Sequence, residues 1–397
     1  MGRECVWPER PVGPGRSSPG GSRGLIYLLL YRRRSTGRGY PGFFAEHGVR
    51  KLAFIVVFGL WTPLVALAQP ASVYQVTVPV DDHSVEARDQ ALSRALEQVL
   101  VRVSGESDVA RQAGASDVLG RARQLVKRFG YTGGGEPEEG ETPEPLMLEA
   151  QFDPNAVKRE MERARLPVWG GERPRTLIAI NTGSGFLTET GEAAASLKAA
   201  AGERGLPLAF PTSSDARQRL SATDIQSGFF QPLNDLQREY GASYALAGEL
   251  QPAGGNWRGR WQLIGPSGIV DSWQSQAGSL AQLQTDAMNH LAGRYASQFA
   301  VRAGQGGGST VVAVDRVSDL QTYARVLNFI SRMTAVGQAI PLQVTGQSAV
   351  FRLELAGSTE QLRSGMALAG WLTEDDLARE TALLFSNGNA LGYRVAR

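Results

Sequence analysis

The stretch that decides the fold runs from Tyr244 to Gly278 and reads YALAGELQPAGGNWRGRWQLIGPSGIVDSWQSQAG. Two turn signals, GGN at 254–256 and PSG at 266–268, divide it into three segments rich in residues that favour strands. Gly, Pro, Asn and Ser are the residues that tight turns between strands prefer. The stretch therefore predicts three successive antiparallel strands, at 244–250, 257–264 and 269–276.

The segments on either side of this stretch carry strand and helix patterns in alternation. On the N-terminal side we expect strands at 176–180 and 206–210 and helices at 192–203 and 232–240. On the C-terminal side, apolar residues three and four apart predict a long helix at 280–301. Strands that alternate with helices build a sheet covered by helices, so residues 167–303 are predicted to form a middle α/β unit.

Three tryptophans lie on the predicted strands of this unit. Trp257 and Trp261 are four residues apart on one strand and share a face, and Trp273 lies on the next strand. The functional interpretation is an exposed platform for a sugar or a protein partner. Because tryptophan is mostly buried, we favour packing beneath the helix at 280–301. Trp169 is interpreted as a wedge between units.

Residues 69–166 are predicted to form an N-terminal α/β unit. A strand begins at Val73, and a helix with one apolar stripe over 87–103 ends at Gly105. A second helix is predicted at 117–129, with Phe129 on its apolar face. The remaining expectations are an acidic Gly/Pro loop at 132–145, a strand at 146–152, a helix at 154–165 and a linker at 166–174.

Residues 309–397, which follow a glycine-rich linker at 304–308, are predicted to form the last unit. Strands are expected at 311–315, 340–345, 350–356 and 391–395, and helices at 318–335 and 359–369. This βαββαβ order is ferredoxin-like, and residues 377–385 have no place in it. The predicted fold class is therefore α/β (α+β), in two or three small mixed-sheet units.

The N-terminal 68 residues carry an export pattern. Arg50-Lys51 precedes an unbroken apolar run at 52–62, and a small-x-small cleavage site, Ala66-Leu67-Ala68, follows, which is the order of a signal peptide. The run is about half of the ~20 residues that a membrane span needs. We predict a signal peptide at 49–68, cleaved after Ala68, and a periplasmic protein. Residues 1–48 are interpreted as a gene-start artefact, with Val49 as the true start.

Charge and cysteine content exclude several classes of function. Residues 1–68 hold ten of the 41 basic and three of the 39 acidic side chains, so residues 69–397 carry 31 and 36, a formal net charge of −5. A nucleic-acid partner is not expected, because such affinity depends on Lys and Arg that neutralise phosphates. Cys5, the single cysteine, lies in the segment 1–48. A cysteine-free mature chain has no disulfide, no thiolate metal site and no lipoprotein anchor.

No residue is predicted to be catalytic, cofactor-binding or metal-binding. His83, beside two aspartates, is expected in a polar turn that caps a helix, and His290 on a helix surface. Ser184, between two glycines, lacks the Gly-x-Ser-x-Gly spacing and a partner histidine. The acidic clusters at 136–144 and 374–376 are expected to be solvated, which gives no reason for a raised carboxyl pKa.

Structural motifs of the chain resemble a bacterial family of exported proteins, domain of unknown function 2066. The resemblance covers most of the chain from about residue 72. It rests on the segments 74–105, 152–153, 166–170, 173–174, 205–211 and 240–248 and on the Trp257–Trp261 strand. It implies a proteobacterial, exported protein and no established activity. At the level of fold alone, the middle unit also looks like the N-terminal domain of TolB.

The leading hypothesis is a non-enzymatic periplasmic binding or assembly module of the bacterial envelope. It follows from the predicted export, the small units and the lack of a catalytic constellation. One alternative is an enzyme that acts on cell-wall glycan through unrecognised carboxylates. Another is a structural stabiliser of another envelope protein. The expected partner is an envelope protein. We expect the mature chain itself to have no membrane anchor after cleavage and no cofactor.

Overall fold

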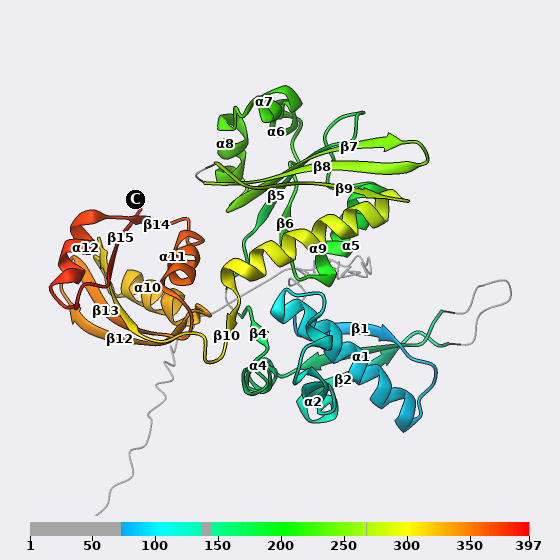
Figure 1. The fold of residues 1–397 in the computed structure, drawn as a ribbon, viewed down its shortest axis with the longest axis horizontal. Coiled ribbons are helices and arrows are strands. Elements are labelled where there is room, and N and C mark those ends of the chain that lie inside the picture. The colour runs from blue at the N-terminus through cyan, green and yellow to red at the C-terminus, as the bar shows by residue number, and fades with distance from the viewer. Residues whose placement is uncertain (1–72, 136–143, 171, 267, 397) are drawn as a thin grey trace, which may run out of the picture. The chain divides into compact units, whose positions relative to one another are not determined.

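The computed structural model describes residues 73–135, 144–170, 172–266 and 268–396 (Figure 1). The predicted artefact at 1–48, the signal peptide at 49–68 and most of the acidic loop lie outside these residues. No helix of the described part is both long and apolar enough to cross a membrane. The described residues confirm the mixed α/β class.

The N-terminal sheet has three antiparallel strands in the order β1-β3-β2. The helix α1 packs on it with one buried stripe, because its apolar residues recur at three and four. The Ser84 hydroxyl accepts from the Ala87 N–H at the start of α1. The elements are β1 (Gln75–Pro79), α1 (Val85–Ser104), the 3₁₀ turn η1 (Val109–Arg111), α2 (Ala115–Leu119), α3 (Ala122–Leu125), β2 (Val126–Thr132), β3 (Met147–Phe152) and α4 (Pro154–Arg163).

The helix predicted at 117–129 is wrong. Its first part is the two short helices α2 and α3, and its second part is the strand β2. Four of the seven residues from Val126 to Thr132 are β-branched or aromatic, and pairing with β3 outweighs the helical period. Phe129 is 44% exposed instead of buried in a helical stripe.

The middle sheet has five strands in the order β6-β5-β7-β8-β9. The pairs β6–β5 and β5–β7 are parallel, and β7, β8 and β9 form the antiparallel meander that the two turn signals predict. The elements are β5 (Thr176–Asn181), α5 (Glu192–Glu203), β6 (Leu208–Ala209), α6 (Ser214–Gln218), α7 (Ala222–Ser227), α8 (Gln231–Glu239), β7 (Tyr244–Ala253), β8 (Asn256–Gly265), β9 (Gly268–Ala277) and α9 (Leu280–Phe299).

Helices cover the two faces of this sheet unequally. The helices α5 and α9 lie on one face, and α6, α7 and α8 on the other (Figure 1). The apolar contacts of α6 to α8 reach β5, β6 and β7 and, on β8, only Ile264. Most of the β8 and β9 surface on that face is therefore left without a helix, and side chains such as Arg260 and Gln274 are exposed there.

The segment predicted as a linker at 166–174 is largely buried. It contains the short strand β4 (Pro167–Val168), which pairs with β10 (Val301–Arg302) in a two-stranded sheet. Trp169 is 1% exposed and stacks on Phe299.

Gly105 follows α1 with a φ of +75°, and a Cβ there would lie 2.8 Å from the Cβ of Ala296. Glycine is required at Gly105 because both the backbone angle and the close packing exclude a side chain.

The last sheet has the order β12-β13-β11-β15-β14. The elements are β11 (Ser309–Asp315), α10 (Leu320–Arg332), β12 (Val336–Val344), β13 (Ser348–Leu355), α11 (Thr359–Ala367), β14 (Leu372–Glu374), α12 (Asp376–Leu383) and β15 (Ala390–Val395). The helices α10 and α11 contribute to the larger apolar cluster, and α12 contributes to a second cluster built on other strand residues.

The sheet departs from the predicted ferredoxin-like pattern after its fifth element. The first five elements follow the βαββα order, but β14 and α12 come next, and α12 occupies most of the unassigned stretch 377–385. The final strand β15 enters between β11 and β14, and it is parallel to β11. In a βαββαβ fold this strand would run antiparallel to the first strand. The extra helix reverses its direction.

Candidate functional site

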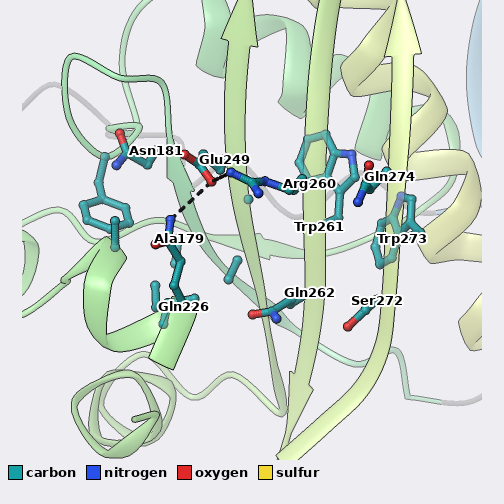
Figure 2. A pocket seen from close by; sticks show the side chains of 15 residues that line it. Ala179, Asn181, Gln226, Glu249, Arg260, Trp261, Gln262, Ser272, Trp273 and Gln274 are labelled. Carbon is teal, nitrogen blue, oxygen red and sulfur yellow. Dashed lines mark hydrogen bonds and ion pairs between the residues drawn. The ribbon is translucent and has the colours of Figure 1, made fainter. Parts of the chain in front are cut away.

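A groove of about 460 Å³ lies at the carboxyl end of β5, on the less covered face of the middle sheet (Figure 2). The chain leaves β5 for β6 on one side and returns to β7 on the other, with helices on opposite faces. The boundary between β5 and β7 is therefore a topological switch point. Ligands of open α/β sheets bind at the carboxyl ends of strands at such points.

Small side chains create the hollow. Ala179 of β5 and Ala247 of β7 lie on its floor, and Ala222 and Ile225 of α7 line one wall. Phe186 lines the rim from the loop that follows β5. An isolated antiparallel bridge between Asn181 and Phe186 closes this loop. Alternate residues of a strand face opposite sides, so the alanines place little volume where larger residues would fill the groove.

An ion pair crosses the floor. Glu249 of β7 lies directly opposite Arg260 of β8, and their side chains are 2.7 Å apart. Gln226 of α7 and Gln251 of β7 donate to the same carboxylate at 3.3 and 2.8 Å. Figure 2 shows the Glu249, Arg260 and Gln226 side chains converging. Three donors on one carboxylate hold Glu249 in place as a fixed acceptor.

Amide and hydroxyl groups make up the rest of the polar lining. Gln262 of β8 lies opposite Ser272 of β9, and Gln274 lies opposite Arg260. Asn181 completes the set at the end of β5, where its Oδ1 accepts from the Gly183 N–H at 2.9 Å. Each glutamine amide offers both donors and an acceptor. The groove therefore presents a nearly neutral surface with many hydrogen-bonding groups.

The lining lacks the parts of a hydrolytic site. Among the residues that line the groove, Glu249 is the one carboxylate, and none is a histidine. Glycosidases need two carboxyl groups on either side of the bond, and nucleophilic catalysis needs a base beside the nucleophile. This arrangement suits binding through hydrogen bonds.

The two histidines of the described part lie outside the groove. His83 is exposed in the turn before α1, where the Asp82 carboxylate accepts from the Ser84 N–H at 2.7 Å. His290 of α9 is on the opposite face of the sheet, 2.9 Å from Asp271, with its ring stacked on Trp273. No cluster of three or more potential metal ligands occurs in the described residues.

Ser184 lies in the β5–α5 loop, close to the groove but apart from any histidine. Its hydroxyl is 3.0 Å from that of Thr182, which also bonds the Gly185 carbonyl. The loop is a hydrogen-bonded turn.

The acidic residues 374–376 serve in ion pairs and a helix cap. Glu374 is 3.7 Å from Arg363, and Asp375 is 3.3 Å from Arg394. Asp375 also accepts from the Ala378 N–H at the start of α12. Glu374 and Asp376 are exposed as expected, but the Asp375 side chain is only 13% exposed, because its ion pair and cap cover it. The other acidic cluster lies largely outside the described residues.

The tryptophans belong to the core beneath α9. Trp261 is 1% exposed, and Trp257 and Trp273 are partly buried against the same apolar cluster. The interpretation as packing is confirmed for Trp261. Trp261 donates from its indole N–H to Ser275 at 2.9 Å and stacks on Trp273. The floor residues of the groove lie on the opposite face of the same strands.

Sequence reasoning missed the groove. The helices α6 and α7, one of which forms its wall, follow Ser213 and Ser221 caps that were not recognised as helix starts. The alternation of polar residues on β8 and β9 was visible, but it is also the pattern of any solvated sheet face.

The comparisons with known proteins reach only parts of the chain. A family model described as "Domain of unknown function (DUF8605)" matches residues 68–170, which include the N-terminal sheet. No curated protein matches the chain. A crystal structure of TolB from Acinetobacter baumannii is similar over 38% of this chain and 35% of the TolB chain, with 11% identity and a TM-score of 0.19. A score this low does not establish a common fold, so the likeness of the middle unit to TolB stays a prediction.

The resemblance to domain of unknown function 2066 is wrong. The matching model belongs to a different family of unknown function, and nothing supports the family named from the motifs. The motifs that suggested it are short structural signals, such as a helix that ends in Ser-Gly. Such signals recur wherever a strand–helix unit needs them.

Proposed function

We propose that the chain is a non-enzymatic binding module of the bacterial envelope, and that its groove holds a segment of a partner polypeptide. The carrying observation is the lining of the groove, which combines fixed amide, hydroxyl and ion-pair groups with a small apolar wall. The envelope location rests on the export pattern of the sequence.

The chemistry of the lining favours a polypeptide over other ligands. A peptide backbone alternates donors and acceptors, as the glutamine and asparagine amides do. A phosphate ligand would need cations without partners, and Arg260 is already paired with Glu249. Phe186 at the rim and Ile225 on the wall would contact one apolar side chain of the partner.

The test is photo-crosslinking in living cells. A photoreactive amino acid at Gln262 faces the groove, and one at Leu377 of α12, which is 71% exposed, is the matched control elsewhere. We expect one envelope protein to be captured reproducibly at Gln262 and not at Leu377. Capture at both positions alike, or at neither, would contradict the proposal.

A second measurement separates binding from a structural effect. Glu249→Ala and Arg260→Ala each remove a partly exposed ion pair, so we expect little change in the unfolding temperature. We expect the crosslink at Gln262 to fall at least tenfold in either variant. A retained crosslink would show that the ion pair does not contribute to binding.

The glycan-enzyme alternative predicts a different result. Because the groove contains one carboxylate, a cell-wall enzyme would need acidic residues from elsewhere. Release of muropeptides by the purified protein, lost on substitution of Glu249, would overturn the binding proposal. Turnover that persists in Glu249→Ala would place an active site outside the groove.

A further inference from the structure

Among the described residues, no strand pairs with the outer edge of β9. It is the last strand of the middle sheet, and its pairing with β8 is regular from Asp271 to Ala277, after one register shift near Val270. The strand contains no proline, lysine or arginine. Its one charged residue, Asp271, is already bonded to His290. An edge of this kind offers unpaired N–H and C=O groups to another strand.

The other edges of the described sheets are protected. The strand β12 contains Pro341 and two register shifts, and β2 has Lys127 and Arg128 directly after its first residue, at a register shift. The strands β4, β6 and β10 have two residues each, β14 has three, and β1 has five and ends in Pro79. Proline, charge, bulges and shortness are the usual means of blocking edge pairing. The contrast singles out β9.

The helix beside this edge is aligned with the centre of the strand. The ring of His290 stacks on Trp273 with 4.1 Å between centroids, so the middle of the outer side of α9 lies over the middle of β9. Asp286 and Arg294 lie one turn before and one turn after His290. Asp286 accepts from Gln282 and Arg294 donates to Ser297, and neither is in an ion pair with a described residue.

We propose that β9 pairs antiparallel with β9 of a second copy of this chain, about a two-fold axis at Trp273. This axis places Asp271 opposite Ser275 of the second copy and Ser272 opposite Gln274 of the second copy, so no like charges meet. Directly opposite residues point to the same face, and each of these pairs satisfies that condition. The pattern of β9 is self-complementary.

The same axis makes the helices complementary. Since α9 contacts both β8 and β9, it lies about one strand spacing from the axis, and the two copies of α9 would be ~10 Å apart, a normal helix–helix distance. Antiparallel helices centred on His290 bring Asp286 opposite Arg294 of the second copy. The two-fold axis repeats this pair, so two such pairs form. This charge complementarity selects a second copy of the chain over an unrelated strand. Ser272 and Gln274 line the groove as well as the strand pairing, but the dimer is argued from the strand edge and the helix charges and does not rest on the proposed function.

Sedimentation equilibrium of the purified protein tests the dimer. We expect a reversible monomer–dimer equilibrium, with Asp286→Arg and Arg294→Asp each raising the dimer Kd about tenfold, because each places two pairs of like charges opposite each other. The double variant, Asp286→Arg with Arg294→Asp, restores the pairing and the Kd. Failure of the charge swap to restore the Kd would overturn the helix alignment.

A second pair of variants tests the strand register. Ser272→Lys with Gln274→Lys sets lysines opposite lysines across the axis, whereas Ser272→Glu with Gln274→Lys sets opposite charges there. We expect the first to raise the Kd about tenfold and the second to leave it near the original value. Gln338→Lys, on the edge of β12, is the control and leaves the Kd unchanged. A monomer at all concentrations, or a dimer indifferent to these changes, would overturn the proposal. Circular dichroism confirms that each variant is folded.

Discussion

At the scale of single residues, Arg173 is a largely buried cation held by backbone carbonyls and an aromatic ring. Its guanidinium donates to the carbonyls of Arg102 and Trp169 and stacks over the Trp169 ring at 4.0 Å. Burial lowers the pKa of Arg173 to about 10. A cation in such a place is stabilised by carbonyl dipoles and an aromatic face in the absence of a carboxylate partner.

Replacing Arg173 should therefore destabilise the fold. Arg173→Ala leaves buried carbonyl oxygens without donors, and we expect a loss of about 3 kcal/mol in the free energy of unfolding. Urea denaturation measures it. Arg175→Ala, at an exposed position two residues away, is the matched control and should change stability by less than about 0.5 kcal/mol. Equal effects of the two changes would contradict this role.

Asp271 makes stability depend on pH. Partial burial raises its pKa, but hydrogen bonds from His290 and the Ser272 N–H outweigh this, and the pKa lies below the ordinary 3.8. A lowered carboxyl pKa stabilises the fold above the unfolded-state value, and this stability is lost as the pH falls through the folded-state value. Between pH 6 and pH 2.5 the thermal unfolding temperature should thus fall more steeply for the wild type than for Asp271→Asn. Both proteins are measured at the same concentration. Parallel curves would be inconsistent with this assignment.

At the scale of elements, β2 is a strand where a helical stripe was expected. Phe129→Ala should cost less than about 1 kcal/mol, because this ring is 44% exposed on the edge of the sheet. Phe152→Ala on β3, where the ring is fully buried, should cost about 4 kcal/mol. Urea denaturation of both variants checks the difference. Similar costs would favour a helix with Phe129 in the core.

The helix α12 shows how an added element redirects a sheet. It packs so closely on β15 that a Cβ at Gly392 would overlap the backbone of Arg379 and Asp375. Its small buried residues, Ala378 and Ala382, allow this approach. Glycine at position 392 of β15 and the alanines of α12 thus allow the helix to lie directly on this inner strand.

At the scale of the whole molecule, the residues that the structure describes belong to one compact unit by backbone contacts, although their apolar core is divided among the sheets. The buried Trp169 and the ion pair of Arg302 with Glu106, 3.0 Å apart, join segments distant in sequence. We expect a single cooperative transition in thermal unfolding, with tryptophan fluorescence and far-ultraviolet circular dichroism coinciding. Separate transitions would show that the sheets unfold independently.

The sequence by itself determined the elements whose signals are local. The meander of β7 to β9 follows from two turns and alternating residues, and α1 and α9 from long apolar stripes with serine caps. Such patterns hold wherever the segment is placed, because they reflect backbone geometry and one buried face. The mixed α/β class followed from them.

Only the tertiary structure decided what depends on distant partners. Pairing with β3 made residues 126–132 a strand, and α12 set the direction of β15. The groove needs α7 and the ends of β5 and β7 together, so no segment alone carries its signal. The open edge of β9 likewise exists because no described strand follows it in the sheet. Long-range packing decides such features, since a pattern of local residues does not specify its neighbours.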